Sequence, residues 1–218
     1  LKAEQQELVH ERRRQAAERL ADDVPPDDLA RIFDSLPERY FTENTVSRID
    51  AHIRLLRSRK GPCAVSFTHH PRRGYSEMTL VAADQPGLLA KVAGVLFSNR
   101  IDILDAAIYS REPDATGGGE ALDVFRVRKA FQGAVDDEAR IKSIERDLEA
   151  VLSGERPVED LVAARPAPSS LLDRPKPKVP PTEVKADNEV STDFTVIDVF
   201  TEDRPGVLYA ITRVLHDK

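Results

Sequence analysis

The sequence lacks tryptophan, has a single cysteine and contains no apolar run long enough to cross a membrane. A membrane helix needs about 20 consecutive apolar residues, and the first residues also lack the apolar core of a secretory signal. Cys63 alone cannot form an internal disulfide, and without clusters of His or Cys it cannot complete a structural zinc site. These absences predict a soluble protein of the cytoplasm.

A charge field of one sign is also missing. The 32 basic and 38 acidic side chains are mixed along the chain, so no dense basic surface is available to bind nucleic acid or an anionic membrane, and we expect neither partner. An apolar content of 40% in 218 residues is enough for the cores of one or two domains. Because the chain begins with leucine and stops as its last expected helix gets under way, we expect a fragment of a longer protein.

Hydrophobic periodicity divides the chain into four parts. Residues 1–60 have the composition and spacing of helices, and residues 63–153 show the order strand, strand, helix, strand, strand, helix. Residues 154–181 contain seven of the 15 prolines and predict an extended linker, after which residues 182–218 repeat strand, strand, helix. The fold class is α+β, a sandwich with helices on one face of a mainly antiparallel sheet. Residues 181–190 could form either the fourth strand of the first unit or the opening strand of the second. A similar ambiguity applies to residues 63–70.

The segment VAADQPGLLAKVAGVLFS, residues 81–98, recurs 119 residues later as FTEDRPGVLYAITRVLHD, residues 200–217. Aligned without gaps, the two copies share an aspartate, a proline, a glycine and two leucines, and the positions between them are similar in kind. A match of this length indicates an internal repeat of a strand, turn and helix.

The turn has a chemistry of its own. Proline suits the first turn of a helix, and glycine lets another backbone or a ligand approach closely. The free N–H groups of the helix start can bind a small carboxylate, such as that of an amino acid. Asp84 on the turn and Asp102 at the start of the next strand would then bind the α-ammonium group. Two alternatives stay open: Asp84 and Asp203 serve only as helix N-caps, and Asp102 is a solvated residue at a strand start.

The stretch DQPGLLAKVAGVLFSNRIDILDAAIYS resembles an ACT domain, a βαββαβ regulatory module that binds amino acids. The resemblance implies a ferredoxin-like sandwich, complete over residues 63–153 and truncated over 182–218. It also implies a ligand-facing turn in each unit, with Asp102 opposite the first. These residues are Asp84, Gln85, Pro86, Gly87, Leu88 and Leu89 in the first unit, and Asp203, Arg204, Pro205, Gly206, Val207 and Leu208 in the second.

The stretch LPERYFTENTVSRIDAHIRLL, leading into two ACT-like units joined by a proline-rich strap, resembles the C-terminal half of the GlnD family of bacterial bifunctional PII uridylyltransferase/uridylyl-removing enzymes. The resemblance implies that residues 1–60 lead out of a preceding HD-type hydrolase domain. It also implies glutamine as effector, the PII signal protein as partner of the parent enzyme, ACT–ACT pairing, and Mg²⁺ or another divalent metal for the parent's catalysis.

The chain itself lacks the catalytic motifs of that family, since it has no Gly-Ser followed by an Asp-x-Asp pair. We expect it to need no cofactor, and neither His69-His70 nor His216-Asp217 has the further ligands of a metal site. Two other interpretations remain: a stand-alone amino-acid-binding protein made of ACT repeats, and a dimerisation module that pairs through exposed sheet edges.

Overall fold

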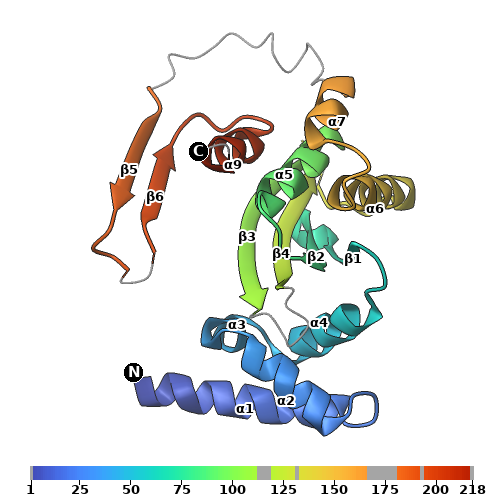
Figure 1. Cartoon of the computed structure of the whole chain (residues 1–218), viewed down its shortest axis with the longest axis vertical. Coiled ribbons are helices and arrows are strands. Elements are labelled where there is room, and N and C mark those ends of the chain that lie inside the picture. The colour runs from blue at the N-terminus through green and yellow to red at the C-terminus, as the bar shows by residue number, and fades with distance from the viewer. Residues whose placement is uncertain (1, 112–118, 131–132, 166–180, 192–193, 217–218) are drawn as a thin grey trace.

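The computed structural model describes residues 2–111, 119–130, 133–165, 181–191 and 194–216 (Figure 1). The chain forms a group of helices first, then a four-stranded sheet with its own helices, and last a two-stranded sheet followed by one helix. Across the described ranges, no helix combines the length and apolar composition that crossing a membrane would require. The predicted α+β fold class is confirmed.

The N-terminal part of the chain is helical, as predicted. Pro26 starts the second helix, where its missing N–H loses no helical hydrogen bond. Thr45 caps the fourth helix by accepting a hydrogen bond from the Arg48 amide (3.4 Å). Tyr40 and Phe41 are fully buried between the helices and the sheet. The four helices are α1 (Lys2–Leu20), α2 (Pro26–Ser35), α3 (Glu38–Glu43) and α4 (Val46–Ser58).

The central sheet has the order β1-β2-β4-β3, and all neighbouring strands are antiparallel. Because β2 and β3 both pair antiparallel with β4, they run parallel to each other, and their C-terminal ends lie at the same end of the sheet. Two helices, α5 and α6, follow β2 and β4. The bounds are β1 (Cys63–His70), β2 (Tyr75–Ala83), α5 (Leu88–Ser98), β3 (Ile101–Arg111), β4 (Glu120–Lys129) and α6 (Glu138–Leu152).

Both faces of this sheet are covered. Leu80 and Phe125 belong to the face that packs against α5 and α6, whereas Leu122 and Val124 pack against the N-terminal helices. Side chains of a strand alternate between the two faces, so one strand serves two cores. The expectation of helices on one face is confirmed for residues 63–153, since α5 and α6 pack on the same face, and the helices of residues 1–60 cover the other face.

Tyr109 joins the sheet to the N-terminal helices. Its hydroxyl donates to the Glu43 carboxylate (2.6 Å) and lies 3.3 Å from the side-chain nitrogen of Asn44, which donates to it. Its ring packs edge-on against Tyr40, with 5.1 Å between ring centroids. The hydroxyl therefore connects two groups of the helical region to a strand.

We expect Tyr109→Phe to lower the free energy of unfolding by about 1–2 kcal/mol, because Glu43 and Asn44 lose a buried partner while the ring packing remains. Chemical denaturation followed by circular dichroism measures the change. Tyr75→Phe is the control, since the Tyr75 hydroxyl has no hydrogen bond to any residue that the structure describes. Equal denaturation midpoints for the two variants would contradict the prediction.

The first unit has its elements in the order β1-β2-α5-β3-β4-α6. In a βαββαβ fold the last strand, after the second helix, lies beside the first strand. Here β1, which precedes β2-α5-β3-β4-α6 in the chain, occupies that edge beside β2. Segment 63–70 is therefore the edge strand of the first sheet. Within segment 181–190, β5 (Glu183–Asp187) pairs with β6 (Val196–Phe200) in a separate sheet, so it opens the second unit.

Helix α7 (Val158–Ala164) lies inside the segment 154–181 that was predicted as an extended linker, and the prediction is wrong for this part. Val158 and Leu161 are buried in the core beside α5. Seven residues are too few to show a helical period beside so many prolines, and the helix is fixed by packing rather than by its own sequence. The stretch 166–180 of the predicted linker lies outside the described residues.

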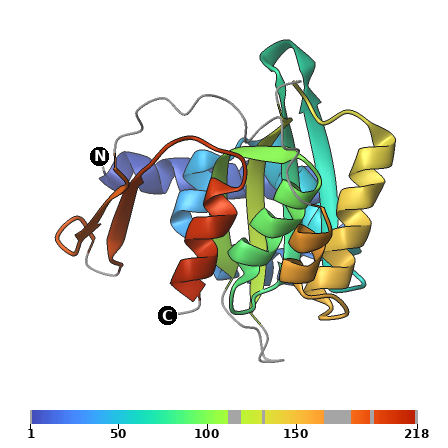
Figure 2. The same cartoon turned by 90° about the horizontal axis from the view of Figure 1, so that it is seen from above.

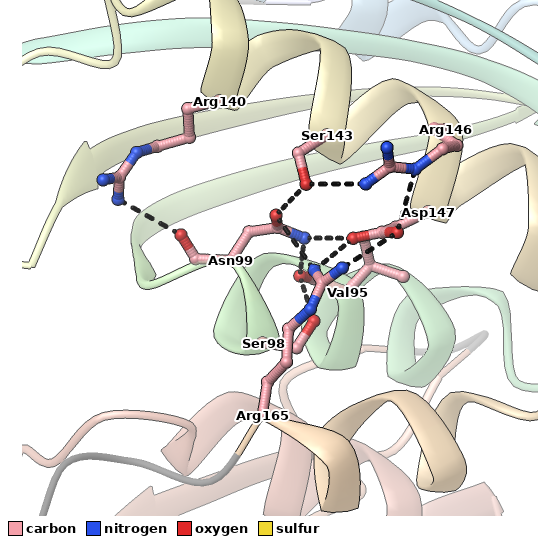
Figure 3. Close-up of polar contacts among 8 residues, drawn as sticks. All are labelled: Val95, Ser98, Asn99, Arg140, Ser143, Arg146, Asp147 and Arg165. Carbon is pink, nitrogen blue, oxygen red and sulfur yellow. Dashed lines mark hydrogen bonds and ion pairs between the residues drawn. The ribbon is translucent and has the colours of Figure 1, made fainter.

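A polar cluster ties the C-terminal end of α5 to α6 and α7 (Figure 3). Asn99, which ends α5, donates through its side-chain amide to the Asp147 carboxylate (2.9 Å), and Arg165, directly after α7, donates to the same carboxylate. The Ser143 hydroxyl donates to the Asn99 side-chain oxygen (2.9 Å). Asp147 is only 5% exposed, so one buried carboxylate holds three helices together.

Helix α9 (Val207–His216) of the second unit packs against α5 (Figure 2). A Cβ atom added at Gly87 would lie 2.8 Å from the His216 ring, and one added at Gly206 would lie 2.9 Å from the Phe97 ring. Each helix start therefore lies under the end of the other helix, so the two helices are antiparallel. Both the glycines and the rings are equivalent at the 119-residue offset, and the repeats are related by an approximate two-fold axis.

Candidate functional site

The two Asp-x-Pro-Gly turns have the same backbone geometry. Gly87 has φ 73° and Gly206 has φ 78°, in the left-handed region that glycine adopts without strain. In both turns the amide of the residue after this glycine donates to the carbonyl two residues before it, at 3.1 Å. The predicted internal repeat is confirmed in the backbone.

Asp84 does not cap α5. The N-cap is Gly87, with no side-chain hydrogen bond to the first turn of the helix, while the Asp84 backbone amide donates to the carbonyl of Gly119 (2.9 Å). The Gln85 side chain accepts a hydrogen bond from Lys91 (2.6 Å) and donates to a carbonyl at the end of α6. The N-cap alternative is therefore wrong for Asp84, and Gln85 positions the turn.

A cavity of about 330 Å³, here called the first pocket, lies beside the Asp84 turn. It is lined by residues 84–90 without Pro86, by Ile108, Ser110, Ala121 and Asp123 from the sheet, and by Thr212, Leu215 and His216 from α9. The pocket thus combines the helix start of one repeat with the helix end of the other. The first amides of α5 have no acceptor within their own helix, so they can bind an anionic group.

Asp123 is the functional candidate that the sequence interpretation missed. The residue is 1% exposed, and its Oδ1 atom has no hydrogen-bond partner among the described residues. Burial is the main cause that raises the pKa of Asp123 to about 7; a hydrogen bond from the Tyr109 backbone lowers it and the Asp84 carboxylate raises it, and both effects are included in that value. The strand pattern could have revealed its burial, because Asp123 lies on the same face of β4 as Ala121 and Phe125, which both belong to the core.

A second cavity of about 310 Å³, the second pocket, lies beside the Asp203 turn. The start of β3 forms its other wall, with Asp102 and, from β4, Arg128. The carboxylate of Asp102 and the Nε of Arg128 are 3.5 Å apart. This pocket therefore carries both charge signs and, like the first, is formed by both repeats.

The expectation that Asp102 lies opposite the Asp84 turn is wrong. Asp102 pairs with Arg128 at one end of β4, whereas Ala83, next to Asp84, pairs with Glu120 at the other end. Along β4, Glu120 and Arg128 are separated by roughly 27 Å, at about 3.4 Å per residue. Because β3 runs parallel to β2, its start cannot face the end of β2, and Asp102 faces the turn of the other repeat instead.

Most of the predicted ligand residues line one of the two pockets, although their binding role stays a prediction. Pro86 and Pro205 line neither pocket. The first pocket includes Asp84, Gln85, Gly87, Leu88 and Leu89. The second includes Asp102, Asp203, Arg204, Gly206, Val207 and Leu208.

Metal-binding groups do not converge in the described part of the chain, where no group of three or more His, Cys, Asp or Glu side chains is placed to hold an ion. His69 is 3.0 Å from the Ser76 hydroxyl, and the His216 ring lies over Gly87. Burial raises the pKa of the Cys63 thiol to about 11, so it stays protonated at neutral pH. The divalent metal that the resemblance implies for the parent enzyme does not fit these residues.

These features define an α+β protein with a ferredoxin-like sheet and a repeated strand–turn–helix unit whose copies share their pockets. No protein-family model matches the chain. It is, however, homologous to one region of the bifunctional uridylyltransferase/uridylyl-removing enzymes, and spans about a fifth of the length of the curated relatives it matches.

Three of these relatives show the extent of the similarity. The enzyme of Rhodospirillum rubrum is 34% identical over 213 residues, which are 96% of this chain and 22% of the relative. That of Bradyrhizobium diazoefficiens is 31% identical over 194 residues, 88% of this chain and 20% of the relative. That of Azospirillum brasilense is 38% identical over 167 residues, 74% of this chain and 17% of the relative.

Proposed function

We propose that the chain is a C-terminal regulatory region of a bifunctional uridylyltransferase/uridylyl-removing enzyme, and that its two repeats bind glutamine. In this proposal the parent enzyme adds UMP to the PII nitrogen-signalling protein and removes it, and the repeats set the balance of the two activities. The homology to one region of enzymes with this name supports the parent's identity. The sequence has no catalytic motif of its own, which supports a regulatory role.

The observation that carries the proposal is the pair of pockets between the repeats. The first pocket is lined by the start of α5, where the Leu89 and Ala90 amides have no acceptor within the helix, and by two carboxyl groups, Asp84 of the turn and Asp123 of β4. A free amino acid has the complementary charges, a carboxylate for the amides and an ammonium for the carboxyl groups. Volumes of about 310 and 330 Å³ fall at the small end of the range for ligand sites, which suits a single amino acid.

Regulation follows from where the pockets lie. Each pocket contacts both repeats, so a bound ligand stabilises one arrangement of α5 against α9 over others. A ligand can shift the balance of distant active sites only by such a difference in affinity between two states. In the proposal Mg²⁺ or another divalent metal serves the catalytic domains of the parent, and no residue of this chain is assigned to it.

We expect L-glutamine to bind the 218-residue chain saturably, with a dissociation constant between about 1 μM and 1 mM. This range corresponds to a binding free energy of about 4–8 kcal/mol. The reason is that all described walls of the first pocket belong to this chain. Isothermal titration calorimetry measures the affinity. D-glutamine is the control, because it cannot direct both charged groups and the side chain as the L-enantiomer does. No heat of binding up to about 10 mM L-glutamine would contradict the proposal.

A further inference from the structure

We propose that Asp123 is the residue of the first pocket that binds the α-ammonium group, and that it makes this pocket selective for ligands that carry a primary ammonium. The inference rests on the proposed function and deepens it, since it names the recognition group and the class of ligand.

Asp123 lies at a position in the sheet that is unfavourable for a carboxyl group, although the Tyr109 backbone hydrogen-bonds to it. Its neighbours on the same face, Ala121 and Phe125, are apolar core residues, and Asp123 itself is 1% exposed with Oδ1 unpaired among the described residues. A buried carboxyl group costs free energy unless it is paired and hydrogen-bonded. Such a group at the wall of a cavity therefore points to a cationic ligand.

The cations near the pocket have other partners. The Lys91 ammonium donates to Gln85 at 2.6 Å, and Arg111 pairs with Glu120. Asp84 adds a second carboxyl group to the same pocket. The pocket thus has two carboxyl groups, one on the turn and one on the sheet, and a cation that enters it meets no competitor among the described lysines and arginines, none of which lines it.

The cation is an ammonium group rather than a metal ion. Two carboxyl groups do not make a metal site, and the described residues hold no cluster of three or more metal-binding side chains. A primary ammonium has three donors and can bind both Asp84 and Asp123. The Leu89 and Ala90 amides at the start of α5 belong to the same pocket, where they can receive the carboxylate of the same molecule.

Ammonium binding at Asp123 links affinity to pH. Burial and the Asp84 carboxylate raise the pKa of Asp123 to about 7, so the acid is neutral below that value and binds an ammonium weakly. Because the charged form binds, affinity rises with pH, by about tenfold between pH 6 and pH 8. His216 faces the pocket from α9 and Lys91 lies on α5; a His216→Gln variant separates the contribution of the imidazole from that of Asp123.

The test compares two ligands and two aspartates in the 218-residue chain. The ligands are L-glutamine and glutaramic acid, which has the same skeleton without the α-ammonium group. Asp123→Asn keeps the side-chain shape and removes the charge, and Asp105→Asn makes the same change on the opposite face of the sheet, where Asp105 pairs with Arg126. Calorimetry at pH 6 and pH 8 gives the affinities.

We expect the wild-type chain and Asp105→Asn to bind L-glutamine about 10- to 100-fold tighter than glutaramic acid at pH 8, the range for a hydrogen bond to a charged group. In Asp123→Asn the pH dependence disappears and the preference falls to what Asp84 alone supports, while both persist in His216→Gln. Equal preference in wild type and Asp123→Asn overturns this inference and leaves the proposed function standing. Absence of L-glutamine binding to the wild type overturns both.

Folding of the variant is not an obstacle to the test. The pKa of Asp123 is higher in the folded chain than the ordinary value of 3.8, so the folded state binds more protons between that value and about pH 7, and stability falls as pH rises through this window. Asp123→Asn removes this loss. A thermal melt at pH 8 therefore shows the variant at least as stable as the wild type, and a lower midpoint would assign Asp123 a structural role and overturn the inference.

Discussion

Replacing Asp147 by alanine is expected to lower the free energy of unfolding by about 3 kcal/mol, near the lower end for a broken buried ion pair. The Asp147 carboxylate is the shared acceptor of Asn99 and Arg165 (Figure 3), and its side chain is 6% exposed. Without it, the buried Asn99 amide and the partly buried Arg165 guanidinium lose their shared acceptor. The value lies at the lower end because Arg165, at 33% exposure, can turn to water. Urea denaturation followed by circular dichroism measures the loss.

Glu138→Ala is the matched control, on the same helix as Asp147. Glu138 pairs with Lys142, but both side chains are largely exposed, and ion pairs of this kind contribute little to stability. We expect no measurable shift in its denaturation midpoint. If Asp147→Ala were as stable as Glu138→Ala, the polar cluster would not hold α5, α6 and α7 together.

Gly94→Leu is expected to destabilise the chain by about 3 kcal/mol through overpacking. A Cβ atom at Gly94 would lie 2.4 Å from the Val158 side chain of α7 and 2.9 Å from the Tyr209 ring of α9. A larger side chain must therefore push away one of these helices. Leucine is a better helix former than glycine, so a loss of stability can be assigned to the steric conflict. Differential scanning calorimetry measures it.

Gly61→Leu provides the comparison for that substitution. An added Cβ atom there would meet only the Glu149 carboxylate, at 3.9 Å, and the backbone angle of Gly61 is compatible with other residues. We expect little change in its unfolding temperature. A similar temperature for both leucine variants would show that α7 and α9 are not packed on Gly94.

Local signals in the sequence predicted the main elements well. The Asp-x-Pro-Gly repeat fixed the position of both turns, because glycine is needed where φ is positive. Asp137 caps α6 and Asn99 ends α5, and both types of residue are common at helix ends beside amphipathic runs. These predictions succeeded because each depends on a few neighbouring residues.

The parts that could not be predicted depend on which strands and helices become neighbours. Sequence spacing suggested that Asp102 serves the nearest turn, yet strand direction carries it to the turn of the other repeat. Helix α7 depends on the core beside α5 for its stability. Asp123 appeared as one acid among many in the sequence, and only its burial at a cavity wall sets it apart.

The antiparallel packing of α5 and α9 has a consequence for symmetry. The ring that covers the first turn is the imidazole of His216, whereas the equivalent ring over the second turn is the phenyl group of Phe97. An imidazole can exchange protons and hydrogen bonds with whatever lies beneath it, and a phenyl group cannot. The two repeats therefore form two chemically unequal pockets, and under the proposed function we expect them to bind glutamine with two different affinities.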